Sequence, residues 1–66
     1  MKPQPKDFDT YSQALVLATK PSLSEAQLYE VAELYNDAVG IKDAQLKEDV
    51  LFIIKNRLWR MPIEGV

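Results

Sequence analysis

The chain of 66 residues contains no cysteine, no histidine and only two glycines. Without cysteine and histidine it forms no disulfide, no Cys/His zinc site and no Ser–His or Cys–His nucleophile. The two glycines, Gly40 and Gly65, cannot provide the spacing of a glycine-rich phosphate-binding loop. We therefore expect a non-enzymatic protein with no cofactor, no metal ion and no small-molecule substrate.

Long apolar segments are also lacking, because no unbroken apolar run exceeds five residues. A membrane-spanning helix needs about 20 such residues, so no membrane span is expected. Lys2, Pro3, Gln4, Pro5 and Lys6 open the chain without an apolar stretch behind them, which argues against a signal peptide. The missing cysteines fit a reducing compartment. We expect a small acidic protein of the cytoplasm, and its net charge of −2 makes nucleic acid an unlikely partner.

Apolar periodicity predicts three helices within a single helical domain, residues 1–66. Pro3 and Pro5 favour a flexible, extended arm over residues 1–6. The first helix is expected at about 8–20, with Asp7 as its N-cap and Pro21 ending it. Its apolar side chains recur at steps of three and four residues. They are Phe8, Tyr11, Ala14, Leu15 and Ala18.

The second helix, at about 25–39, has the clearest start signal. Ser24 and Gln27 are spaced as a capping box, with Leu23 placed to pack on Leu28. Gly40 suits a left-handed position after the last turn, so that Ile41 folds back onto Tyr35. The expected buried face consists of Leu28, Val31, Ala32, Tyr35, Ala38 and Val39.

The third helix is expected at about 43–60, ending before Pro62. A buried β-strand over residues 50–54 is the rival interpretation, but helical spacing continues well beyond this run and no partner strand is evident. The inner stripe is Leu46, Val50, Ile53, Ile54, Leu58 and Met61, with Leu51 at its edge. Short connections make neighbouring helices antiparallel. The predicted fold is all-α: a small three-helix bundle, or a helical hairpin with a short first helix and an extended N-terminal arm.

Charge is segregated along the chain. Residues 21–40 contain four acids and no base, and residues 55–60 contain three bases and no acid. Glu30, Glu33 and Asp37 share one helical face that is suited in principle to a hard cation, although a solvated acidic face is the favoured interpretation. Asp37 and Glu48 also have the end-to-end spacing of an EF-hand loop. The frame lacks the intervening ligands and has Lys42 where glycine is needed.

The feature that suggests function is a second apolar side of the third helix. On a helical wheel Phe52 and Trp59 lie together, opposite the inner stripe. Aromatic side chains bordered by long polar ones are typical of protein interfaces. The predicted partner-binding residues are Phe52, Lys55, Asn56, Trp59 and Arg60, and a secondary acidic face comprises Glu30, Glu33 and Asp37. These residues indicate an interaction module (adaptor, inhibitor, regulator or small subunit) that binds a protein or itself as a homodimer or other homo-oligomer.

Three alternatives remain open. In the first alternative the third helix is central in the bundle, so that Phe52 and Trp59 belong to the core. In the second, the face that contains these two rings binds a membrane surface. The last is a helix-turn-helix regulator that binds nucleic acid. Lys42, Gln45 and Lys47 would then read bases while Lys55, Arg57 and Arg60 contact phosphates, against the repulsion of Asp43, Glu48 and Asp49.

Overall fold

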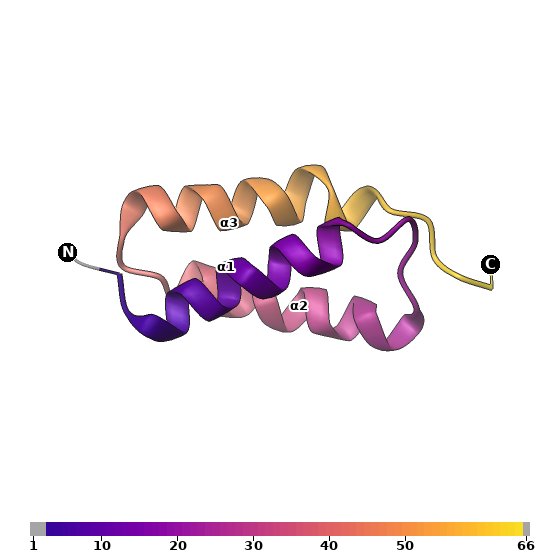
Figure 1. Cartoon of the computed structure of the whole chain (residues 1–66), viewed down its shortest axis with the longest axis horizontal. Coiled ribbons are helices and arrows are strands. Elements are labelled where there is room, and N and C mark those ends of the chain that lie inside the picture. The colour runs from indigo at the N-terminus through magenta and orange to yellow at the C-terminus, as the bar shows by residue number, and fades with distance from the viewer. Residues whose placement is uncertain (1–2, 66) are drawn as a thin grey trace.

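The computed structural model describes residues 3–65 and shows three α-helices followed by a short 3₁₀-helix. These are α1 (Pro5–Ala18), α2 (Glu25–Val39), α3 (Ala44–Asn56) and η1 (Leu58–Arg60). The helices lie along one axis with α2 antiparallel to its two neighbours, and each α-helix packs against both others (Figure 1). The molecule measures 42 × 18 × 16 Å. The predicted all-α class is confirmed as a three-helix bundle.

A single apolar core runs between the three helices. Residues 50–54 belong to α3, so the alternative β-strand is wrong. The most deeply buried large side chains come from the α1–α2 connection, α2, α3 and η1, and they are Leu23, Val31, Val50, Ile54 and Leu58. Among the described residues no helix has the length and apolar character required to cross a bilayer.

Helix α1 begins three residues earlier than expected. Gln4 is the N-cap, and Pro5 occupies the first helical turn, where its missing N–H costs nothing. Asp7 is therefore not the N-cap; its carboxylate accepts from the Gln4 backbone N–H at 3.0 Å. Residues 5 and 6 of the expected arm are helical, while residues 1 and 2 lie outside the described part. The helix also ends at Ala18 rather than at Lys20.

The buried face of α1 is rotated from the predicted stripe. Leu17 is buried together with Ala14 and Ala18, whereas Phe8 and Leu15 are 51% and 41% exposed. Thr10 is buried because its hydroxyl donates to the Lys6 carbonyl at 3.1 Å, which satisfies its polar group inside the helix. The predicted stripe was chosen by apolar character alone. It therefore left out Thr10 and Asp7, which are hydrogen-bonded and lie on the inner face.

The start of α2 is confirmed. The Ser24 hydroxyl accepts from the Gln27 backbone N–H at 3.3 Å, and the Gln27 side chain accepts from the Ser24 N–H at 2.9 Å. Gly40, in contrast, has φ −83° and is not left-handed, so that part of the prediction is wrong. The inner face of α2 contains Leu34 in place of Ala32 and Val39, which are exposed.

Loss of the α2 cap is expected to cost measurable stability. Ser24→Ala removes the acceptor of the Gln27 N–H and should lower the free energy of unfolding by about 1 kcal/mol. In a domain of this size that corresponds to a melting temperature about 4–8 °C lower, measured by circular dichroism. Ser12→Ala is the control, since Ser12 is exposed within α1 and should change little. Equal effects of the two substitutions would contradict the capping role.

The third helix is shorter than predicted. The α-helix ends at Asn56, Arg57 leaves helical geometry with φ −122° and ψ −59°, and the chain tightens into η1. The break precedes the segment whose Pro62 carbonyl accepts from the Leu23 N–H, so a contact with the α1–α2 connection accompanies the shorter helix. The inner stripe itself is confirmed: Leu46, Val50, Ile54 and Leu58 are buried, and Ile53, Leu51 and Met61 pack against them.

A contact between distant segments follows η1. The Leu23 N–H donates to the Pro62 carbonyl at 2.9 Å, and the Glu64 N–H donates to the Leu23 carbonyl at 2.9 Å. The Ser22 hydroxyl adds a bond of 3.1 Å to the Glu64 carboxylate. Residues 62–64 are thereby held against the α1–α2 connection, which no local sequence signal indicated.

Candidate protein-binding site

The two aromatic side chains predicted to bind a partner are both accessible. Phe52 is 66% exposed and Trp59 is 55% exposed. The alternative in which these rings form the core of the monomer is therefore wrong. Both rings are therefore accessible to a partner.

The two rings are not, however, successive members of one helical stripe. Helix α3 ends between them, and Trp59 belongs to η1. Its indole instead packs on Tyr35 of α2, with ring centroids 5.1 Å apart and planes inclined by 53°. Such tilted pairs contribute about 0.5–1.5 kcal/mol beyond the area they bury. Tyr35 was predicted only as a core residue; the structure makes it the support of Trp59.

The polar residues predicted around the rings divide into two groups. Lys55 and Arg60 are exposed, on either side of the helix break. Asn56 is also exposed, but its side-chain amide donates to the Phe52 carbonyl at 3.1 Å within its own helix. Lys55, Arg57 and Arg60 are thus three exposed basic side chains in the segment that contains the two rings.

The secondary acidic face is not on the same side as the rings. Glu30, Glu33 and Asp37 are all exposed. Asp37 lines a groove against α1, and Glu30, seven residues earlier, shares its flank of α2. Tyr35 lies on the other flank, facing η1. Among the described residues no three carboxylates gather in a metal-binding arrangement.

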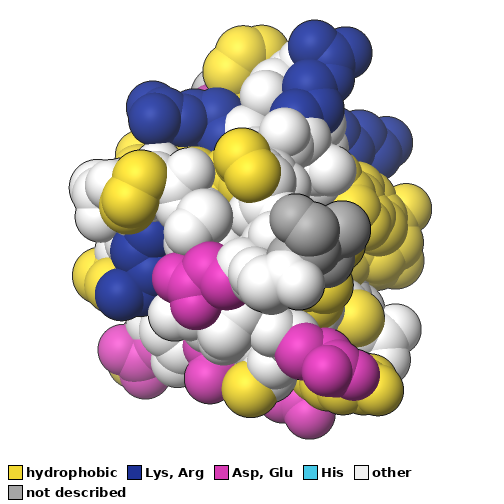
Figure 2. Space-filling view, turned by 90° about the vertical axis from the view of Figure 1, so that its right-hand side faces the viewer, with side chains coloured by type: hydrophobic (Ala, Val, Ile, Leu, Met, Phe, Trp, Pro, Cys, Tyr) yellow, Lys and Arg dark blue, Asp and Glu magenta, His cyan; other side chains and the backbone are white. Residues whose placement is uncertain are grey.

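Among the acids of α2, Glu25 is the nearest in helical angle to Tyr35. Glu25 shares a stripe of α2 with Ala32, and this stripe borders the one containing Tyr35. Both Glu25 and Ala32 are exposed. Figure 2 shows the resulting distribution: basic side chains at the top over the end of α3, acidic side chains at the bottom over α2, and apolar side chains between them on the right. We call this surface the ring face, defined by Tyr35, Phe52, Lys55, Trp59 and Glu25.

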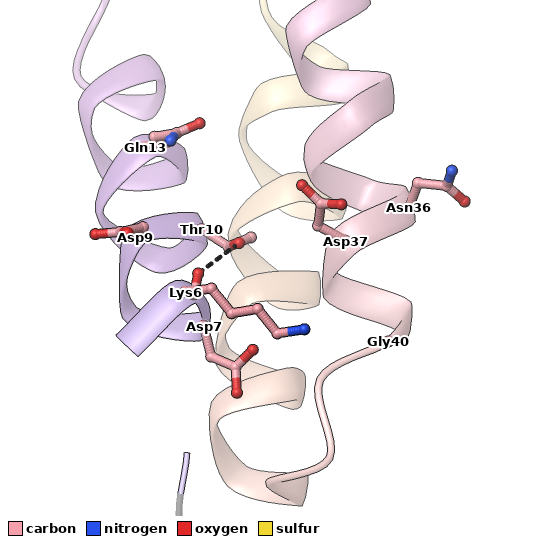
Figure 3. Close-up of a pocket in the computed structure, with 8 residues that line it drawn as sticks. All are labelled: Lys6, Asp7, Asp9, Thr10, Gln13, Asn36, Asp37 and Gly40. Carbon is pink, nitrogen blue, oxygen red and sulfur yellow. Dashed lines mark hydrogen bonds between the residues drawn. The ribbon is translucent and has the colours of Figure 1, made fainter. Parts of the chain in front are cut away.

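The polar groove between the start of α1 and the end of α2 is a weaker candidate. It measures about 430 Å³ and is open to solvent. Figure 3 shows Lys6 reaching toward α2 while Asp9 and Asn36 point away from the groove. Its two buried members, Asp7 and Thr10, already bond within α1. Ligand pockets are usually lined mainly by apolar side chains, whereas polar and charged side chains line this groove.

The outer side of α1 is a second apolar area. Phe8, Leu15 and Val16 are 51%, 41% and 59% exposed, and no charged residue occurs from Thr10 to Thr19. This absence of charge was a signal available in the sequence. Nothing in the structure shows what would cover these side chains.

Comparison with known protein families, with curated proteins and with solved structures finds no match to this chain. Only the geometry and chemistry of the site therefore bear on function.

Proposed function

We propose that this protein is a non-enzymatic protein-interaction module that binds a partner protein through the ring face. The single observation that supports this proposal is Trp59, a large ring that is held in place by Tyr35 and yet is 55% exposed. A ring already fixed loses little conformational freedom on binding. Tryptophan, tyrosine and arginine are also the residue types most often responsible for binding energy at interfaces.

The polar border of the ring face fits the same role. Lys55 and the nearby Arg60 are exposed basic side chains, and such charges orient a partner more than they add affinity. The packed rings of Trp59 and Tyr35 supply the apolar contact. A partner with an apolar segment flanked by carboxylates matches this distribution.

The nucleic-acid alternative gains less from the structure. The two helices of a helix-turn-helix cross at about 90–120°, whereas α2 and α3 lie side by side and antiparallel (Figure 1). Of the proposed base readers, Lys47 is half-buried and the Gln45 amide donates to the Asp49 carboxylate at 3.1 Å. No observation favours this function over the first.

A photo-crosslinking experiment in the native cell tests the proposal. A benzophenone amino acid replaces Phe52, and a control chain has it at Gln13, which is exposed in the polar groove. We expect discrete protein adducts from position 52 that are missing from position 13 and are lost when Trp59→Ala is added. The proposal fails if position 52 gives no adduct, or gives the same adducts as position 13.

A further inference from the structure

The ring face has opposite charges at its two edges. Lys55, at the end of α3, is basic, whereas Glu25, at the start of α2, is acidic. Both helix ends lie at the same end of the bundle, beside the α1–α2 connection (Figure 1). In Figure 2 apolar side chains lie on the right, between basic side chains at the top and acidic side chains at the bottom.

A surface of this kind is complementary to a copy of itself. In a two-fold symmetric interface, residue i of one protomer contacts residue j of the other, and j contacts i. When the axis runs parallel to the helices, points at the same height along the bundle meet, and the basic edge of one protomer faces the acidic edge of the other. Two Lys55–Glu25 contacts then form between the protomers, one on each side of the Trp59 and Tyr35 rings.

We propose that the ring face binds a second copy of this chain, with α2 and α3 of the two protomers packed about a two-fold axis parallel to the helices. This inference rests on the proposed function, because it identifies the partner of the same face. Phe52 of each protomer then lies against the exposed side of the other protomer's α2, next to Ala32.

The size of the protein is consistent with this partner. A specific interface buries about 800 Å² on each side, which is roughly a sixth of the protomer's 4690 Å² of accessible surface. A domain this small has a limited core, and self-association is one of the ways in which such domains gain stability.

Charge reversal tests the arrangement by sedimentation equilibrium of the purified chain. The unmodified protein should form a dimer of twice 7.5 kDa. Lys55→Glu places two acid–acid contacts in each dimer, and Glu25→Lys places two base–base contacts. Each substitution should therefore raise the dimer Kd about ten-fold or more. An equimolar mixture of the two variants should restore a heterodimer, because both contacts are again between opposite charges.

Glu30→Lys is the matched control, since it makes the same charge change on the flank of α2 away from the rings and should leave the Kd unchanged. Circular dichroism checks that each variant is as helical as the parent chain. A monomer at every concentration, or no recovery in the mixture, overturns the second-copy inference. If crosslinks from position 52 then reach a different protein, the proposed function still stands; if they reach none, both fail.

Discussion

Leu58→Ala is expected to remove a large part of the stability of the fold. Leu58 is completely buried although it lies in η1, beyond the end of α3. Truncating a buried leucine costs about 2–5 kcal/mol, since apolar contacts are lost and a cavity remains. A chain of 66 residues has a total free energy of unfolding of about 3–10 kcal/mol. The variant should therefore be largely unfolded, or close to it, at 37 °C.

The measurement is urea unfolding followed by circular dichroism at a protein concentration low enough to keep the chain monomeric, because association adds to apparent stability. Phe52→Ala, in the adjoining helix α3, is the control. Phe52 is 66% exposed, and alanine favours the helix, so its free energy of unfolding should change by less than about 1 kcal/mol. Equal losses in the two variants would show that the core does not extend past the helix break.

Trp59→Ala is expected to have the largest effect on association. A central tryptophan of an interface contributes 2 kcal/mol or more, which corresponds to a Kd raised at least about 30-fold. Loss of the ring pair with Tyr35 should lower monomer stability only by about 0.5–1.5 kcal/mol. Phe8→Ala is the control, because Phe8 is a comparably exposed aromatic on α1. Its removal should leave the Kd within about two-fold, the change expected at a site outside the interface.

The chain contains one tryptophan, so its fluorescence reports on the ring face directly. In the dilute monomer Trp59 is half in water, and its emission should be accessible to a soluble quencher. As the chain concentration rises through the dimer Kd, the emission should shift to shorter wavelength and quenching should fall. Emission that is independent of concentration, together with association that Trp59→Ala leaves intact, would place the interface elsewhere.

The predictions that held were those that depend on local sequence. Ser24 and Gln27 are three residues apart and bond only to each other's backbone, so their spacing is sufficient to define the start of α2. The stripe from Leu46 to Leu58 succeeded for a related reason. Its residues are apolar at nearly every inner position, and no rotation of the helix buries them better.

Predictions failed where contacts that residue type alone does not specify selected the conformation. Phe8 and Leu15 look like core residues on a wheel, but the inward side of α1 is chosen by how α2 and α3 pack on it. Gly40 has the residue type of a left-handed cap but remains right-handed, with its N–H bonded to the Asp37 carbonyl. A residue type permits a conformation, and the surrounding contacts select it.

The candidate site also has features that the local sequence predicted and features that only the tertiary contacts determined. The exposure of Phe52, Lys55, Asn56, Trp59 and Arg60 agrees with the sequence prediction, and their role in binding stays a prediction. The contact of Trp59 with Tyr35 was not foreseen, because the break at Arg57 moves Trp59 off the α3 wheel. The position of Asp37 in the groove against α1, on the flank of α2 away from Tyr35, likewise needed the tertiary structure.

The amino-acid sequence by itself determined that this protein is helical, where α2 begins, which side of α3 is buried, and that cysteine and histidine chemistry is excluded. Each of these depends on residue types and on spacings shorter than one helix. Only the tertiary structure decided which flank of α1 faces inward, that the chain leaves the α-helix at Arg57, and that Trp59 rests on Tyr35 of another helix. These features depend on contacts between residues far apart in the chain, which local periodicity does not encode.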